Sequence, residues 1–103
     1  MREYLGETQR EILETLWGNS DGLTPQQVHA SLNTDSAYIT IYTLLRRLQG
    51  RGLVESNNGV YRATVSREAF VRRILLDIRD NFPNEFAAII RNHRLTAENA
   101  AAV

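Results

Sequence analysis

The clearest pattern along the chain is a helical repeat of apolar residues that ends shortly before a glycine. Four residues recur at the spacing i, i+3, i+4 and i+7: Ile41, Leu44, Leu45 and Leu48. A stripe at this spacing faces a core, so the pattern predicts a helix over about residues 36–49. With Gly52 at C′, the apolar pair of a Schellman motif falls on Leu48 and Leu53, which predicts where this helix ends.

The side of this helix opposite the stripe is mostly polar. It carries Ile39, Thr43 and Arg46, and it is flanked by Thr40, Tyr42 and Arg47. Hydroxyl groups, a phenol and two arginines suit hydrogen bonds to phosphates and base edges better than they suit a core. This side therefore predicts contact with nucleic acid.

Two earlier helices are indicated by similar signals. An apolar stripe predicts a helix over residues 5–17, with Trp17 in the core. Two starts are open for this helix, a capping box between Thr8 and Glu11 or a start one turn earlier. Leu23 is expected in a short strand. A second, brief helix follows, because the segment from Thr24 to Gln27 places threonine at the N-cap, proline at N1 and glutamine at N3.

A hairpin is predicted after the polar-faced helix. Its arms are residues 53–57 and 60–65, joined by Asn58-Gly59, the favoured pair for a two-residue type I′ turn. Helix, short strand, helix, helix and hairpin in this order make a winged helix-turn-helix, which we assign to residues 1–65. The fold class is mainly α with a small β-hairpin.

Residues 66–103 are predicted to form a helical segment. Ser66 caps a helix to about Asn81, Pro83 stops it, Asn84 caps a second helix, and a third begins at Thr96. Its apolar stripes allow two interpretations, a fold back onto the winged helix or pairing with a second chain. We favour pairing, because these stripes would otherwise leave a large exposed apolar patch. The expected dimer contacts are Phe70, Ile74, Leu75, Ile78, Phe86, Ile89 and Ile90.

The charge balance narrows the class of partner. The charges of twelve basic and twelve acidic residues cancel over the whole chain. The segment from Asp35 to Arg62, however, contains four arginines and only two acidic residues. A local basic face on a neutral body suits a sequence-selective DNA reader. The chain has no apolar run long enough to span a bilayer and no signal-peptide pattern at its start, so we expect a cytoplasmic protein without a membrane segment.

Nothing in the sequence indicates catalysis, a metal or a cofactor. Cysteine is absent, and His29 and His93 have no ligand neighbours at useful spacing. No Ser-His-Asp order, phosphate-binding loop or paired-carboxylate motif is present. The chain is therefore not expected to be an enzyme.

Several motifs together resemble the penicillinase-repressor family of the BlaI/MecI/CopY type. They are L-G-E-x-x-R-E-I-L-E-x-L-W at residues 5–17, T-P-Q-Q-V-H-A-S-L-N at 24–33, A-Y-I-T-I-Y-T-L-L-R-R-L at 37–48 and R-G-L-V at 51–54. The segments S-R-E-A-F-V-R-R-I-L-L-D and E-F-A-A-I-I-R-N-H-R-L-T-A-E are similar to that family's dimerisation segment, of which the final helix is mostly missing here.

The resemblance implies a dimeric repressor whose third helix enters the major groove of an inverted repeat. Tyr38, Thr40, Thr43 and Arg46 fall where the family contacts DNA, and the turn at residues 57–59 falls at the wing tip. The resemblance also implies a sensor protease as a partner, cutting at an Asn-Phe bond. That bond occurs here at Asn81-Phe82, earlier than the family's site. The Cys-x-Cys motifs of the copper-responsive branch are absent, so metal sensing is not implied.

The sequence thus predicts a homodimeric, sequence-specific repressor that binds double-stranded DNA, with no cofactor. Alternatives are a winged helix used as a protein-interaction module and a heterodimeric co-regulator. An alternative for both Tyr38 and Tyr42 is packing that supports the helix without DNA contact, and this interpretation is stronger for Tyr38, which lies nearer the core stripe by helical angle. The predicted DNA contacts are Tyr38, Thr40, Tyr42, Thr43, Arg46, Arg47, Arg51, Asn57, Asn58 and Arg62.

Overall fold

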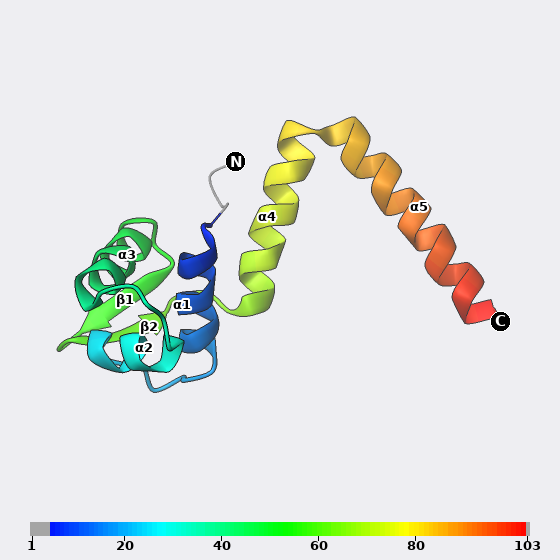
Figure 1. The fold of residues 1–103 in the computed structure, drawn as a ribbon. Helices are drawn as coiled ribbons and strands as arrows, with labels where there is room; N and C mark the ends of the chain where they lie inside the picture. Colours follow the sequence, from blue (N-terminus) through cyan, green and yellow to red (C-terminus); the bar gives the residue numbers. More distant parts are fainter. Residues whose placement is uncertain (1–4, 103) are drawn as a thin grey trace. The chain divides into compact units, whose positions relative to one another are not determined.

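The apolar stripes of the first part of the chain come together in one unit of three helices and a hairpin (Figure 1). The elements are α1 (Glu7–Trp17), α2 (Pro25–Leu32), α3 (Tyr38–Gly50), β1 (Val54–Asn57) and β2 (Val60–Ala63). The computed structural model describes residues 5–102 and the side chains of residues 5–93. The predicted fold class, a mainly helical chain with a small hairpin in winged-helix order, is confirmed.

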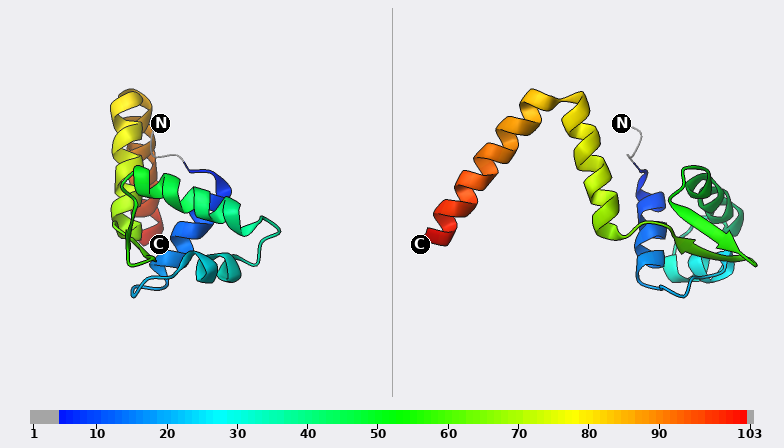
Figure 2. Two further views of the ribbon diagram at one scale, coloured as in Figure 1. Left: turned by 90° about the vertical axis from the view of Figure 1, so that its left-hand side faces the viewer. Right: turned by 180° about the vertical axis from the view of Figure 1, so that it is seen from behind.

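The core of this unit, residues 5–70, lies where the three helices meet the hairpin. Ile12, Val28, Ile41, Leu45, Leu48 and Leu53 are among its fully buried side chains. α2 packs on α1 and α3, α1 packs on β2, and α3 packs on β1. Figure 2 shows the hairpin running beside α3. Every helix of the unit therefore keeps one face for the core and one for solvent.

Hydrogen bonds at the helix starts follow local sequence signals. The capping box of α2 is confirmed: Gln27 N–H donates to Thr24 Oγ1 at 3.2 Å, and Thr24 N–H donates to Gln27 Oε1 at 2.9 Å. Of the two starts open for α1, the capping box at Thr8 is wrong, because the helix begins at Glu7 with Gly6 at its N-cap. There Gln9 accepts the Gly6 N–H at 3.3 Å, which leaves Thr8 inside the first turn.

The end of α3 confirms the predicted Schellman motif. Leu53 N–H donates to the Leu48 carbonyl and Gly52 N–H to the Gln49 carbonyl, both at 3.0 Å. Gly52 has φ of 75°, and Leu48 and Leu53 are both fully buried. The helix begins at Tyr38, two residues later than expected, because Ser36 belongs to the preceding turn, where its N–H donates to Thr34 Oγ1 at 3.1 Å.

The hairpin is antiparallel, with Asn57 paired to Val60 next to a two-residue turn. Asn58 and Gly59 have φ of 54° and 79°, so the predicted type I′ turn is confirmed. Leu23 adds a single bridge to the outer side of β2, pairing with Tyr61 through N–H···O bonds of 3.0 and 2.7 Å. The short strand expected at Leu23 is thus one residue long.

Two helices make up the rest of the described chain, α4 (Arg67–Asn81) and α5 (Pro83–Ala102). The cap at Ser66 is confirmed, since its Oγ accepts the Ala69 N–H at 3.0 Å. Residues from 71 onward form a unit separate from residues 5–70. The helices expected to start at Asn84 and at Thr96 are instead one continuous helix, whose first residue is Pro83. Within the described residues no helix is long and apolar enough to cross a membrane.

Candidate nucleic-acid interface

The outward face of α3 is exposed and mostly polar. It is formed by Ile39, Thr40, Thr43, Arg46 and Arg47, all exposed, and we call it the outer face of α3. Ile41, Leu45 and Leu48 lie on the opposite side of the helix and are fully buried. The core stripe therefore fixes the helix so that this outer face meets solvent.

The arginines of the outer face have no partner among the residues that the structure describes. Neither Arg46 nor Arg47 forms an ion pair or hydrogen bond with any described residue, and both are exposed. Arg67 behaves differently: its guanidinium pairs with both carboxylate oxygens of Glu14 and lies 5.2 Å from the centre of the Trp17 ring. The two arginines of α3 thus keep their donors for an external acceptor such as a phosphate or a guanine edge.

The hydroxyl of Thr43 is partly used inside the helix. It donates to the carbonyl of Ile39 at 2.9 Å, one turn earlier. A hydroxyl has one proton to donate and two lone pairs that accept. Thr43 can therefore still accept a hydrogen bond and present its methyl group, whereas Thr40 on the same face has no such bond.

Three aromatic rings join the start of α3 to α2. The Tyr38 ring stacks on the Tyr42 ring at 6.3 Å and meets the His29 ring edge-on at 6.2 Å. His29 Nε2–H donates to the Ser36 carbonyl at 2.8 Å, so the ring also ties α2 to the turn before α3. Tyr38 therefore packs on two neighbouring rings although it is exposed, whereas Tyr42 is half-buried. The core ends short of the first turn of α3, and helical angle alone does not reveal that.

The wing tip lies on the hairpin turn. Asn57 and Asn58 are exposed there, and Gln49 at the end of α3 donates to Ser56 Oγ of β1 at 3.4 Å. Arg51, just past α3, is half-exposed. The structure therefore connects the end of α3 directly to the strand that carries the wing.

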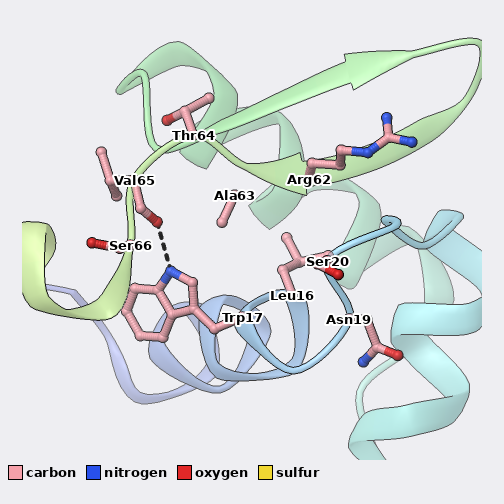
Figure 3. Close-up of a pocket in the computed structure, with 9 residues that line it drawn as sticks. All are labelled: Leu16, Trp17, Asn19, Ser20, Arg62, Ala63, Thr64, Val65 and Ser66. Carbon is pink, nitrogen blue, oxygen red and sulfur yellow. Dashed lines mark hydrogen bonds between the residues drawn. The ribbon is translucent and has the colours of Figure 1, made fainter.

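Arg62 differs from the other predicted DNA contacts in its surroundings. It lines a pocket of about 270 Å³ between the end of α1 and β2, together with Trp17, Asn19, Ser20 and five other residues (Figure 3). Its Cγ would lie 2.8 Å from a Cβ placed on Gly22. β1 and not β2 packs on α3, so Arg62 belongs to the hairpin side and is not part of the outer face.

The polar groups around this pocket are mostly engaged within the chain. The Trp17 indole N–H donates to the Val65 carbonyl at 2.8 Å, and Asn19 Nδ2 donates to the Thr15 carbonyl at 2.8 Å (Figure 3). The Thr64 hydroxyl donates to the Gly52 carbonyl. Trp17 is accordingly half-buried and not a core residue, because its ring forms the pocket wall.

The predicted dimer contacts are divided between two environments. Phe70 is 6% exposed and packs against Trp17, with ring centroids 5.8 Å apart, so its side chain is buried within the winged-helix unit. The other predicted contacts lie on α4 and α5, where Leu75, Ile89 and Ile90 are exposed and Ile74, Ile78 and Phe86 are half-buried. Through residue 93, α5 has no buried side chain.

The Asn81-Phe82 bond lies at the junction of these two helices. The Phe82 N–H donates to the Ile78 carbonyl at 2.7 Å, and Phe82 carbonyl accepts the Phe86 N–H at 2.9 Å. The bond is thus held in hydrogen-bonded backbone at both sides. Among the described residues no cluster of His, Cys, Asp or Glu is arranged to hold a metal ion.

Ile39 is the outer-face residue that the predicted contact set left out. Its helical angle placed it opposite the core stripe, but a large apolar side chain carries no hydrogen-bonding signal. The link from His29 to Ser36 was also missed, because seven residues separate them and no local pattern joins them.

Comparison with known proteins agrees with this geometry. A family model described as penicillinase repressor matches residues 5–102. Two relatives named transcriptional regulator BlaI, from the CDC 1551 and H37Rv strains of Mycobacterium tuberculosis, are each 38% identical over 52 residues. That match covers 48% of this chain and 38% of each relative, so the chain spans well under half of their length. Because the family model covers almost all of the chain, the protein belongs to the penicillinase repressor family.

Proposed function

We propose that this protein is a sequence-specific DNA-binding transcriptional repressor that acts as a homodimer on an inverted-repeat operator. The observation that carries the proposal is the outer face of α3, where Arg46 and Arg47 are exposed without partners among the described residues. Membership of the penicillinase repressor family supports the same function.

The outer face suits the major groove of DNA, which is wide enough to admit a helix. Arg46 lies on that face one helical turn beyond Thr43 and is the candidate for a bidentate contact with guanine. Arg47 and Arg51 lie beside it and are expected to hold phosphates, which set the position of the helix but do not read sequence. The exposed Asn57 and Asn58 place polar groups at the wing tip for an adjacent part of the backbone.

Dimer formation is supported by the apolar stripes of α4 and α5. Val71, Leu75, Phe82, Ile89 and Ile90 have 43% to 64% of their surface exposed. Along α4 these residues follow a helical spacing with Ile74 and Ile78, so they lie on one side of the helix. Exposed apolar stripes of this kind are typical of surfaces that a second chain covers. In a dimer of winged helices the half-sites lie about 34 Å apart, or a multiple of that distance.

A selection from random-sequence DNA by the purified protein tests the proposal. We expect an enriched inverted repeat at near-physiological salt, because two identical reading helices related by a two-fold axis read a palindrome. Enrichment of one unrepeated half-site would contradict the homodimer. No enrichment by a folded protein would contradict sequence-specific binding altogether.

Salt dependence separates a DNA reader from a protein-interaction module, the second function that a neutral winged helix permits. A DNA reader releases counterions, so the logarithm of its affinity falls linearly with the logarithm of salt concentration. We expect that steep fall on the enriched sequence. A protein-interaction module would show weak DNA binding at every salt concentration.

A further inference from the structure

The most unusual residue of the outer face is Ile39. With 63% of its surface exposed, it is far more open than an isoleucine of this core, such as Ile12 or Ile41, both at 0%. Within residues 5–70 the only other exposed large hydrophobic side chain is Tyr38, at 37%. The winged-helix unit therefore leaves its one exposed large aliphatic side chain on its candidate DNA-reading surface.

Thr43 extends this apolar point along the helix. Its hydroxyl donates to the Ile39 carbonyl at 2.9 Å, so the proton is used within the helix. A threonine bonded in this way has its methyl group and the lone pairs of its oxygen left for an outside partner. Ile39 and the methyl of Thr43, one turn apart, give the outer face a small apolar centre beside Arg46.

Only one base edge in the major groove presents an apolar group. Thymine carries a 5-methyl group there, whereas the other bases present hydrogen-bond donors and acceptors. We infer that Ile39, with the methyl of Thr43, is a specificity-determining contact to a thymine methyl in the operator. This inference rests on the proposed function, because it requires the outer face of α3 to lie in a major groove.

The helix also limits where that thymine lies. Ile39 and Arg46 are seven residues apart, which is about 10 Å along the helix axis. Successive bases are about 3.4 Å apart. The thymine is therefore expected within about three base pairs of the guanine that Arg46 reads.

Replacing thymine by deoxyuridine tests the contact, because it removes the methyl group and nothing else. The operator is first obtained by selection from a random-sequence duplex library with the full chain. In that duplex each thymine is then replaced by deoxyuridine in turn, and binding is measured by fluorescence anisotropy. Loss of one methyl contact is expected to weaken binding about fourfold at one thymine of each half-site.

Variants at Ile39 assign that loss to the side chain. Ile39→Ala is expected to bind the thymine duplex more weakly and to lose most of the sensitivity to deoxyuridine, since only the methyl of Thr43 remains. Ile39→Val, which keeps two methyl groups, is expected to retain most of the sensitivity to deoxyuridine. Equal thermal unfolding midpoints for the three proteins will show that the exposed position does not affect folding.

The outcomes separate this inference from the function on which it rests. An enriched sequence whose binding is the same with deoxyuridine at every thymine overturns the methyl contact but leaves the repressor standing. Sensitivity that persists unchanged in Ile39→Ala also overturns it. A selection that enriches no sequence overturns the proposed function and the contact together, and then favours a protein partner for Ile39.

Discussion

At the scale of single residues, neighbours decide what an arginine of this chain does. Arg67 is held by both carboxylate oxygens of Glu14 and by the face of Trp17, so it fastens the start of α4 to α1. Arg46 is exposed on a helix whose other side is fully buried, and the described residues offer it no acidic partner. The same side chain is thus structural at one position and available for recognition at the other.

Replacing Arg46 by alanine is expected to weaken binding to the operator by about 1–3 kcal/mol and to relax the preference at one base pair. The measurement is the affinity for the operator and for its three variants at each position of the half-site. Arg10→Ala removes another exposed arginine, from α1, and serves as the charge control. Equal weakening of all sequences by Arg46→Ala would make this arginine a phosphate contact.

Residue burial was the part of the structure that the sequence predicted least well. Trp17 and Phe70 fell on apolar stripes and were assigned to the core and to the dimer, yet they pack on each other inside the winged-helix unit. Tyr38 lies nearer the core stripe by helical angle than Tyr42, yet it is the more exposed of the two. Helical angle tells which way a side chain points, but burial depends on which other elements lie opposite, and no local pattern contains that information.

At the scale of elements, the turn between α2 and α3 controls how the reading helix is placed. His29 of α2 donates to the Ser36 carbonyl at 2.8 Å and meets the Tyr38 ring edge-on. These are side-chain contacts that join the two helices across the turn. They orient α3 relative to α2 independently of the buried stripe.

His29→Ala is therefore expected to lower the free energy of unfolding by about 1 kcal/mol and to weaken operator binding without changing the preferred sequence. Urea unfolding gives the first quantity, and a repeat of the DNA selection gives the second. A changed consensus would contradict a purely positioning role, because it would place the histidine in contact with bases.

Gly22 allows the chain to approach the hairpin closely enough for Leu23 to pair with Tyr61 of β2. Its φ is 90°, and a Cβ there would lie 2.5 Å from Val60 Cγ1 and 3.0 Å from the Tyr61 carbonyl oxygen. Gly22→Ala is expected to destabilise the fold by about 1–3 kcal/mol, because it adds both backbone strain and a clash.

Gly50 provides the matched control for that substitution. It lies at the end of α3, and a Cβ there would meet nothing within 4 Å. Gly50→Ala is expected to be neutral or to stabilise the fold by up to about 1 kcal/mol, since alanine favours helix. Urea unfolding of both variants provides the comparison, and equal stabilities would show that neither strain nor the clash at Gly22 matters.

The elements themselves were largely predictable, because their ends depend on short-range chemistry. The capping box at Thr24, the Schellman motif at Gly52 and the turn at Asn58-Gly59 are each set by residues at fixed spacing. α5 is the exception. Pro83 was expected to end one helix and Asn84 to cap the next, but proline is also favoured as the first residue of a helix, and α5 begins with it.

At the scale of the whole molecule, two surfaces have different roles in the proposed repressor. The outer face of α3 carries two exposed arginines that have no partner among the described residues, whereas residues of α4 and α5 make up most of the exposed large apolar side chains. A neutral net charge is consistent with this division, because a local basic surface attracts DNA without a large nonspecific charge. The dimer surface then determines selectivity, since two linked half-sites bind far more selectively than one.

A substitution at Ile89 tests the dimer surface directly. Ile89 is 64% exposed and shares one side of α5 with Phe86 and Ile90, while Ala88 lies on the opposite side and is also exposed. In a two-fold dimer each substitution occurs twice, so Ile89→Gln is expected to weaken association by about 3 kcal/mol or more, roughly a hundredfold. Ala88→Gln is expected to leave association unchanged.

Sedimentation equilibrium measures the dimer dissociation constant of both variants. Their affinities for a duplex with two half-sites and for a duplex with one half-site show how dimerisation affects DNA binding. The Ile89 variant should lose affinity for the two-site duplex and keep it for the one-site duplex. Equal dimerisation of both variants would instead place the interface away from this side of α5.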